Sequence, residues 1–488
     1  MNLLFRTCLL ALTMFAAPVG AVTYEVNATQ DAVDASPGDG VCETAAGNGI
    51  CTLRAAIQEA NASTSGANLI EVPAGTYQLT LAGSDEDVAA SGDLDVLGNV
   101  SIVGADPSTT IVDAGLLDRV FDIGSSANVT LSNLTIQHGG NVETGGGIQN
   151  SGILALTNCV IQNNGGNNGP VRFGAGIANL KALVLTNSIV RDNQAGATGQ
   201  AGAAGAGIYN VLGASIDASQ ISGNVATGMG AIAGGILSQD PAITQIAATA
   251  ITNNTAPQAG GVALAGGQLI VLSSLVANNS ASGSGGAGGG FRVVGGSASL
   301  VNVTVSGNAA STGGGLAVTS GTVDLGNVTV SDNRVVNGTG HGGGLQVASG
   351  ATVSARNSLL AENQDPNASA QPDCSGTLTS NGYVLLQSTV GCLFETSTGD
   401  LTGIDPNLGP LSDNGGPTKT QALISSSAAV DAANPAGCTG LNGSPLLTDQ
   451  RGEPRPSDGN NNGISACDMG AFELQSDIIF ANGFEDSD

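Results

Sequence analysis

Residues 313–333 read GGGLAVTSGTVDLGNVTVSDN, and this stretch decides the fold. Apolar residues alternate within three short runs, as Leu316 and Val318, then Val323 and Leu325, then Val328 and Val330. A period of two is typical of β-strands. Between the runs stand Ser-Gly, Gly-Asn and Asp-Asn pairs, which favour tight turns. The stretch therefore predicts three short strands joined by turns that have no room for a helix.

The Gly-Gly-Gly step that opens this stretch, or the same step with one alanine such as Gly-Ala-Gly, recurs along the chain at intervals of 25 to 31 residues. Its last glycine falls at Gly147, Gly176, Gly207, Gly235, Gly261, Gly290, Gly315 and Gly344. Such a period indicates stacked supersecondary units with insertions in the turns. Strands that recur once per coil pair in parallel with their equivalents. We expect an all-β, right-handed parallel β-helix in which the step marks the entry to the first strand of each coil.

Asparagines flank the third strand, one before it and one after it, at a constant six-residue interval. The pairs are Asn158 and Asn164, Asn187 and Asn193, Asn302 and Asn308, Asn327 and Asn333, and Asn357 and Asn363. Stacked asparagines at one corner are expected to bond to the coils above and below. Cys159 occupies the same position as Ser188 and Val328, so we expect a small buried residue and not a nucleophile.

The composition indicates an exported protein. Arg6 precedes an apolar run and a small-residue step, which predicts a signal peptide over residues 1–21. No later segment has the roughly 20 apolar residues of a membrane helix. The 488 residues include 39 acidic and 12 basic side chains, for a net charge of −27. This charge disfavours nucleic acid as a partner and attracts divalent cations.

Six of the eight cysteines lie close together in pairs outside the repeats: Cys42 and Cys51, Cys374 and Cys392, and Cys438 and Cys467. In an exported chain these pairs predict disulfides that staple the irregular ends, although the spacing alone does not fix the connectivity. Cys8 lies in the predicted signal peptide, and Cys159 has no nearby partner.

The N-terminal end is predicted to cap the solenoid. Residues 51–61 read CTLRAAIQEAN, with Leu53, Ala56, Ile57 and Ala60 on one helical face and Thr52 placed to cap the helix start. We expect this helix to cover the first coil and residues 69–77 to form the first strand. Together with SGDLDV at 91–96 and LDRVF at 117–121, the run resembles bacterial CSLREA-domain proteins, with departures at Thr52 and Ala55.

The C-terminal part resembles the choice-of-anchor Q region in its segments GIDP at 403–406, DNGGPT at 413–418, DQRG at 449–452 and CDMGAFE at 467–473. The glycine-rich centre is similar to polymorphic outer-membrane protein repeats. These resemblances imply a pectin-lyase-like β-helix at the bacterial surface or outside the cell, and no known reaction. Residues 478–485, IIFANGFE, resemble a short terminal tail of exported proteins.

Two acidic segments are candidate calcium sites. Asp85, Glu86 and Asp87 precede Asp93 and Asp95 on an early loop. DGNNNG at 458–463 fits the first half of an EF-hand-type loop, and there Asp458, Asn460, Asn462 and Asp468 are the candidate ligands, with Met469 at the position of the usual glutamate. The alternative for the second segment is a plain turn braced by the neighbouring disulfide.

The central repeats are poor in catalytic residues. Between Gly124 and Asn363 the few carboxylates and bases do not recur at a spacing that gathers them on adjacent coils, and GHG at 340–342 lacks a neighbouring Asp-Asp pair. The sequence therefore favours an exported, non-catalytic surface scaffold or adhesin that binds glycans. The alternative is a polysaccharide lyase or glycoside hydrolase.

The expected organisation has five parts: a signal peptide at 1–21, an N-terminal cap at 22–66, the β-helix at 67–365, a C-terminal region at 366–474 and a tail at 475–488. The sequence leaves open which glycan is bound and how the chain is retained at the surface.

Overall fold

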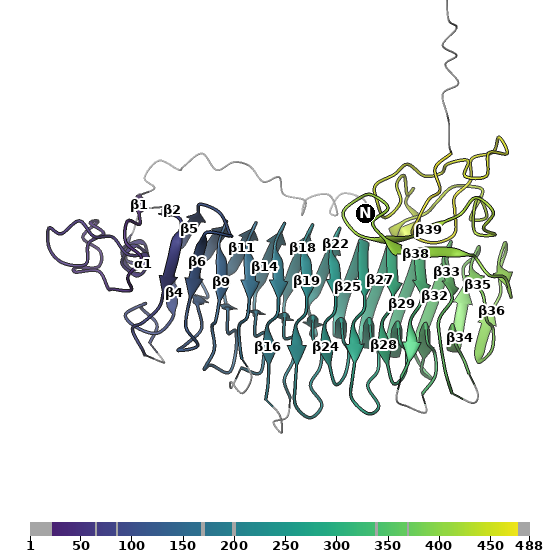
Figure 1. Cartoon of the computed structure of the whole chain (residues 1–488), viewed down its shortest axis with the longest axis horizontal. Helices are drawn as coiled ribbons and strands as arrows, with labels where there is room; N and C mark the ends of the chain where they lie inside the picture. The colour runs from purple at the N-terminus through teal and green to yellow at the C-terminus, as the bar shows by residue number, and fades with distance from the viewer. Residues whose placement is uncertain are drawn as a thin grey trace, which may run out of the picture.

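The computed structural model describes residues 22–63, 66–83, 86–166, 171–197, 202–336, 340–367 and 370–476. The predicted signal peptide, residues 477–488 of the predicted tail, and Asp85 lie outside these ranges. Within them the chain forms an elongated parallel β-helix with a short helix at one end and an irregular region beside the other (Figure 1). The predicted all-β solenoid is thus confirmed.

Three strands build each coil, and equivalent strands of successive coils form three ladders. The first ladder contains β4 (Leu94–Val96), β7 (Phe121–Ile123), β10 (Ile148–Asn150), β13 (Ile177–Asn179), β17 (Ile208–Asn210), β21 (Ile236–Ser238), β31 (Leu345–Val347) and β34 (Cys374–Ser380). The second contains β1 (Thr23–Glu25), β2 (Asn68–Val72), β5 (Asn99–Gly104), β8 (Asn128–Ser132), β11 (Ile153–Thr157), β14 (Ala182–Thr186), β18 (Gly213–Asp217), β22 (Ile243–Ala247), β32 (Thr352–Arg356) and β36 (Cys392–Glu395). The third contains β3 (Gly75–Gln78), β6 (Thr110–Asp113), β9 (Thr135–Gln137), β12 (Val160–Gln162), β15 (Ile189–Arg191), β19 (Gln220–Ser222), β23 (Ala250–Thr252), β33 (Leu359–Ala361), β35 (Leu385–Leu386) and β37 (Leu401–Thr402).

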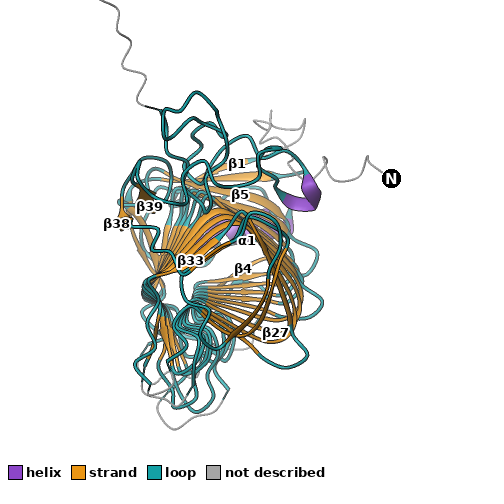
Figure 2. Ribbon diagram, turned by 90° about the vertical axis from the view of Figure 1, so that its right-hand side faces the viewer, coloured by secondary structure: helices purple, strands orange, loops and turns teal. Residues whose placement is uncertain are grey.

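Three long strands run through all three ladders without a break. These are β25 (Val262–Ala277), β27 (Phe291–Ser306) and β29 (Leu316–Ser331). A short fourth ladder follows the third strands and contains β16 (Gln194–Ala195), β20 (Val225–Ala226), β24 (Thr255–Ala256), β26 (Ser280–Ala281), β28 (Ala309–Ala310) and β30 (Arg334–Val335). Viewed along the long axis, the strands stack in register (Figure 2).

The core is a narrow apolar column inside the coils. Equivalent residues stack on each other, as Ile148 does on Ile177 and Leu154 on Leu183, and these side chains are fully buried. One continuous apolar cluster runs from Tyr24 to Leu386. The alternation of apolar residues at 316–330 therefore predicts correctly which side chains point into the core.

The glycine step is explained by the distance between coils at one corner. A Cβ atom on the last glycine of each step would lie 2.5–2.7 Å from the carbonyl oxygen of the equivalent residue one coil on. It would also lie about as close to the amide of an asparagine in its own coil, 2.9 Å in the case of Gly147 and Asn164. Contacts this short exclude any side chain at this corner, which explains why the step ends in glycine in each of these coils.

The predicted asparagine ladder is present. Its amide groups donate from Nδ2 to Oδ1 of the next coil at 2.9–3.0 Å, in the order Asn164, Asn193, Asn224, Asn254, Asn279, Asn308, Asn333 and Asn363, and the ladder ends on Asp373. A second ladder joins Asn150, Asn179 and Asn210 at 2.7 Å. Both ladders are buried, where a satisfied amide network holds the coils in register.

The N-terminal helix α1 (Leu53–Ala62) covers the end of the solenoid as expected. Thr52 accepts a hydrogen bond from the backbone N–H of Ala55 at 3.1 Å and so caps the helix. The expectation for the first strand was wrong, because β1 precedes the helix and pairs with β2 in parallel. The helix is therefore inserted between two strands that pair with each other.

The parallel stack continues past residue 365, the expected end of the β-helix. Strands β34, β35, β36 and β37 still pair in parallel, so the last coils reach Thr402. The disulfide between Cys374 and Cys392 lies within these coils. The disulfide between Cys42 and Cys51 lies beside the N-terminal helix.

The remaining C-terminal residues turn back along the outside of the solenoid (Figure 1). They include the antiparallel pair β38 (Leu408–Ser412) and β39 (Thr420–Leu423) and the 3-10 turn η1 (Leu441–Gly443). Asn302 donates to the carbonyl of Thr448 at 2.8 Å, and the N–H of Ala471 donates to Thr329 at 3.0 Å. This region therefore covers the side of β27 and β29.

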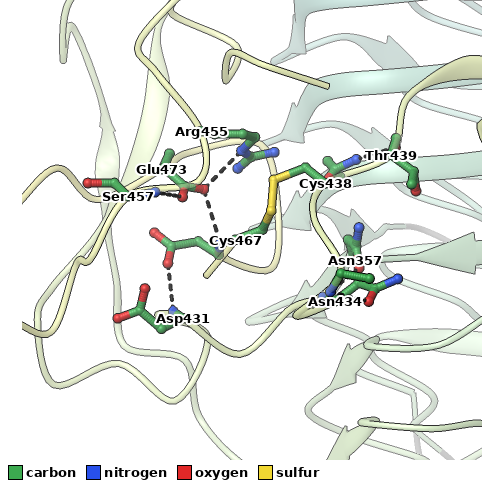
Figure 3. The surroundings of a disulfide bond; sticks show 12 residues. Asn357, Asp431, Asn434, Cys438, Thr439, Arg455, Ser457, Cys467 and Glu473 are labelled. Carbon is green, nitrogen blue, oxygen red and sulfur yellow. Dashed lines mark hydrogen bonds and ion pairs between the residues drawn. A yellow bond between two sulfur atoms is a disulfide. The ribbon is translucent and has the colours of Figure 1, made fainter. Parts of the chain in front are cut away.

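A buried polar cluster holds the C-terminal region together beside the disulfide of Cys438 and Cys467 (Figure 3). Arg455 and Glu473 form an ion pair at 2.9 Å with both side chains fully buried. Arg455 also donates to Asn302 of β27, which joins the cluster to the solenoid. The three disulfides indicate an oxidising, extracytoplasmic environment.

Candidate functional site

An acidic cluster lies on the outer face of the first ladder, near the N-terminal end. The register aligns Asp95 of β4 with Asp122 of β7, and both strands bury the residues on either side of these aspartates. Because side chains alternate between faces, the two aspartates share the outward row. Asp93 lies just before β4, and the carboxylates of Asp93, Asp95 and Asp122 lie within 4.8 Å of one another.

The N-terminal helix holds the segment that carries two of these aspartates. Arg54, which is fully buried and paired with Asp31 at 2.6 Å, donates to the backbone carbonyls of Gly92 and Asp93 at 2.8 and 2.9 Å. Asn61 donates to the carbonyl of Asp95 at 2.7 Å. The cap helix thus also fixes the backbone of the site.

One guanidinium group lies against the cluster. Arg119 Nε is 3.2 Å from Asp93 Oδ2, and its Nη1 donates to Asp122. Asp122 also accepts from Gln149 Nε2 at 3.0 Å, and Asp95 accepts from the N–H of Ala89 at 2.7 Å. Two of the three carboxylates therefore share a single counter-charge.

Burial and mutual repulsion favour protonation of the cluster. Desolvation, with the charge of Asp95, raises the pKa of Asp93 to about 8. Desolvation, with the charge of Glu86, raises the pKa of Asp95 to about 7. Desolvation also raises the pKa of Asp122, against the opposing effects of Arg119 and Gln149. At neutral pH the cluster therefore holds both protonated and ionised carboxyl groups.

The cluster borders an open cavity of 570 Å³. Six carboxylates and one guanidinium line it, from Glu86, Asp87, Asp93, Asp118, Asp122, Glu143 and Arg119. Asn141, Thr144 and Gln149 add neutral polar groups. A cavity of this size accommodates a small molecule or a short segment of a polymer.

The spacing of the three aspartates is also compatible with a cation, because Ca²⁺ takes oxygen ligands at about 2.3–2.6 Å. The Arg119 guanidinium opposes this, since it already lies against Asp93 and Asp122 and repels a second positive charge. We therefore interpret the cluster as a proton-sharing group.

The two acidic segments singled out in the sequence have different outcomes. In the first, Asp93 and Asp95 join the cluster, Asp87 lines the cavity, and Glu86 bonds to the backbone of Val88 and Ser91. In the second, Asp458 accepts from the backbone N–H groups of Asn462 and Gly463 within its own loop.

In the second segment, the carboxylate of Asp468, the fourth candidate ligand, is bonded to backbone groups outside the loop at 458–463. Asp468 is fully buried, and its oxygens accept from the N–H groups of Asp431 and Leu474 at 2.7 and 2.6 Å. Asn460 and Asn462 accept from backbone N–H groups two residues further along the loop. A calcium site at this loop stays a prediction.

Two other residues singled out in the sequence have structural surroundings that explain them. His341 lies 2.7 Å from Asp365, and both are remote in sequence from the acidic cluster. Cys159 is buried, and burial raises the pKa of its thiol to about 11, which makes it unreactive at neutral pH. The interpretation of Cys159 as a packing residue is confirmed.

Sequence reasoning did not identify Asp122, Arg119 or Gln149 as site residues. Gln149 is the second residue after the glycine step that ends at Gly147, and the register aligns it with Asp122. The second residues after each step form one outward row, and extending that row back through residues 94–96 and 121–123 would have found Asp95 and Asp122. The glycine step is missing from those two coils, so the repeat was not followed into them.

The chain resembles known proteins in architecture alone. No protein-family model matches it, and no curated protein sequence matches it. The crystal structure of the pectate lyase Pel9A is similar with a TM-score of 0.41 and 14% identity, over 93% of this chain and 98% of that one. The catalytic domain of a GH87 alpha-1,3-glucanase in complex with tetrasaccharides is similar with a TM-score of 0.33 and 13% identity, over 80% of this chain and 66% of that one.

These comparisons assign no family, and the solenoid fold rests on the parallel strand pairing described above. Within the described ranges, none of the helices has the length and apolarity that crossing a lipid bilayer requires.

Proposed function

We propose that this protein is an extracytoplasmic glycoside hydrolase that cleaves a polysaccharide in the acidic cavity. The observation that carries the proposal is the group of Asp93, Asp95 and Asp122, which combines close spacing, raised pKa values and an open cavity. Glycosidic cleavage needs one protonated and one ionised carboxyl group at the scissile bond.

The residues divide between these two roles. Asp93 remains protonated near neutral pH and donates a proton to the leaving oxygen. Asp122 is the more exposed of the three and is held by Arg119 and Gln149, which favour its ionised form. Asp122 therefore attacks the anomeric carbon, and Asp95 sustains the raised pKa of Asp93 by repulsion.

The separation of the carboxylates favours a particular stereochemical outcome. Inverting enzymes leave about 6.5–9.5 Å between the two carboxyl groups for a water molecule, whereas retaining enzymes leave about 5–5.5 Å. The oxygens here lie within 4.8 Å of one another. The proposed reaction therefore proceeds with retention: Asp122 forms a covalent glycosyl intermediate while Asp93 protonates the leaving oxygen, and Asp93 then takes a proton from the water that hydrolyses the intermediate.

The test is the release of reducing ends from a panel of polysaccharides. We expect cleavage by the wild-type chain, and a decrease of at least about 100-fold in Asp93→Asn and in Asp122→Asn. Asp106→Asn, on an exposed turn of another coil, is the matched control and keeps full activity. Full activity of Asp122→Asn would contradict the proposal, and release of unsaturated ends would indicate a lyase instead.

A non-catalytic glycan-binding scaffold is the second candidate. The observation that favours it is the absence of any further three-residue His, Cys, Asp or Glu cluster in the part of the chain that the structure describes. In that case the long surface of the solenoid serves to span distance and to attach to glycans. Retention of the wild-type chain on a polysaccharide without any cleavage product would support this function and exclude the hydrolase.

A further inference from the structure

Two aromatic side chains lie on the outer surface next to the acidic cavity. The rings of Phe173 and Tyr209 have their centroids 5.2 Å apart and are tilted by 46°. Both are only partly buried, whereas Phe121 and Phe291 are buried inside the coils. The chain has 9 Phe, 4 Tyr and no Trp in 488 residues, so a surface pair of rings is unusual here.

The register places this pair in continuation of the acidic cluster. The outward row of the first ladder runs through Asp95, Asp122, Gln149, Ala178 and Tyr209 on successive coils. In the adjacent turn, Thr144 pairs with Phe173. Since Thr144 and Gln149 line the cavity, the ring of Phe173 lies one coil beyond its edge and Tyr209 two coils beyond.

Direct contacts join the cavity to the rings. Glu143, which lines the cavity, is 3.2 Å from Arg172, and the Arg172 guanidinium lies 5.3 Å from the centroid of Phe173. Phe173 and Tyr209 pack on a small apolar cluster that includes Ala204 and Ala233. This packing and the Arg172 guanidinium over the Phe173 ring hold the two rings, and both side chains stay partly exposed.

The chemistry of this strip matches a sugar polymer. Aromatic rings present an apolar face with a negative quadrupole, which packs against the C–H groups of a sugar ring. Carboxylates and amides along the same row accept and donate hydrogen bonds to hydroxyl groups. Adjacent coils are about 4.8 Å apart, so Tyr209 lies about 14 Å along the axis from Asp122. This length suits several sugar units in a row.

The charge selects the class of polymer. The cavity carries six carboxylates against one guanidinium, and the whole chain has a net charge of −27. This field repels a polyuronate and leaves an uncharged chain unaffected. We propose that Phe173 and Tyr209 form a stacking subsite for an uncharged polysaccharide, which runs along the solenoid axis into the acidic cavity. The proposal rests on the proposed function, because the cavity is taken as the cleavage point.

The test compares short and long oligosaccharides. Binding of gluco-, xylo- and manno-oligosaccharides of two and six units is measured by calorimetry on the Asp122→Asn chain, with oligogalacturonate as the charged comparison. We expect a hexasaccharide to bind at least about tenfold more tightly than its disaccharide, and this gain to disappear in Phe173→Leu and Tyr209→Leu. Leucine keeps the apolar packing and removes the ring.

Phe394→Leu is the matched control, because it removes a partly buried ring at the other end of the solenoid and is expected to keep the gain. An unchanged length dependence in both ring variants, or tighter binding of oligogalacturonate, would overturn the subsite even if the wild-type chain cleaves polysaccharides. If the ring variants lose the gain while the wild-type chain cleaves nothing, the subsite stands and the hydrolase does not.

Discussion

Two neighbouring coils fill the same corner with residues of exchanged size. One coil places a glycine beside an asparagine, and the preceding coil places a valine beside a glycine. In the coil that starts at Gly145, the last of three glycines lies against Asn164, and a Cβ on Gly147 would lie 2.9 Å from the asparagine amide. In the preceding coil the register places residues 118–120, which are Asp, Arg and Val, at the positions of 145–147. Gly139 there replaces the asparagine.

The exchange is sterically reciprocal. Asn164 needs a glycine beside it, whereas Val120 needs Gly139, where a Cβ would lie 3.1 Å from a valine methyl group and 1.8 Å from the carbonyl of Gly146. Where Gly139 replaces the asparagine, the position of Gly147 can carry a side chain, and Val120 occupies it. Asp118 and Arg119, which line the cavity, stand at the two preceding positions, so the candidate site lies where the repeat abandons its glycines.

The largest effect on folding is expected at a central glycine. In Gly290→Val the new side chain would meet Gly315 O at 2.7 Å and Asn308 Nδ2 at 3.1 Å. The asparagine ladder cannot shift without breaking its buried hydrogen bonds, so we expect a loss of about 3 kcal/mol in the free energy of unfolding. The measurement is chemical denaturation followed by far-UV circular dichroism.

Gly98→Ala is the control for this prediction, because the nearest atom to its Cβ is 3.6 Å away. It is expected to change stability by less than about 0.5 kcal/mol. Equal stability of the two variants would refute the steric explanation of the glycine step.

The second prediction concerns the pH dependence of the acidic coil. The pKa of Asp93 is about 8 in the folded chain and near 4 when unfolded, so the folded state binds the proton more tightly. The favourable contribution of Asp93 to the free energy of unfolding is therefore complete below about pH 4 and is lost as the pH rises through 8. We expect Asp93→Asn to be more stable than the wild-type chain at pH 9 by at least about 1 kcal/mol, and not at pH 5.

Thermal unfolding of both chains at several pH values measures this difference. Glu143→Gln, which removes an exposed carboxylate of the same cavity, is the control and should follow the wild-type chain. If the melting temperatures of Asp93→Asn and the wild-type chain change with pH in parallel between pH 5 and 9, Asp93 is ionised throughout that range.

The smallest effect is expected from calcium at the loop of Asp458. If the loop binds Ca²⁺, millimolar calcium raises the melting temperature by a few degrees, and Asp458→Asn removes this shift. Asp93→Asn should retain it, because Arg119 opposes a cation at the acidic cluster. No shift in the wild-type chain would leave the loop as an ordinary turn, and loss of the shift in Asp93→Asn would relocate the cation.

The fold was predictable because its determinants repeat. The glycine step recurs every 25 to 31 residues and the asparagines keep a six-residue interval, each for the same physical reason in every coil, so a single unit at 313–333 sufficed to predict the strands. The site was only half predictable. The sequence placed Asp93 and Asp95 in an acidic segment that is a candidate calcium site. Asp122 is their neighbour only through the register of β4 and β7, which the sequence did not show.

The position of the C-terminal region was not predictable. Its contacts with the solenoid join residues far apart in sequence, as Asn302 and Thr448 or Thr304 and Gln450. No periodic signal connects such pairs. The resemblance of this region to a known segment identified it as a separate C-terminal part. Its place beside β27 and the extension of the coils to Thr402 did not follow from that resemblance.

The central claim is that a glycan binds where charged residues replace the glycine step. The most direct measurement is a crystal structure of the Asp122→Asn chain with an uncharged hexasaccharide. The account predicts sugar density beside Asp93 and Arg119 that continues over Phe173 toward Tyr209. Density on another face of the solenoid, with this row empty, would contradict it.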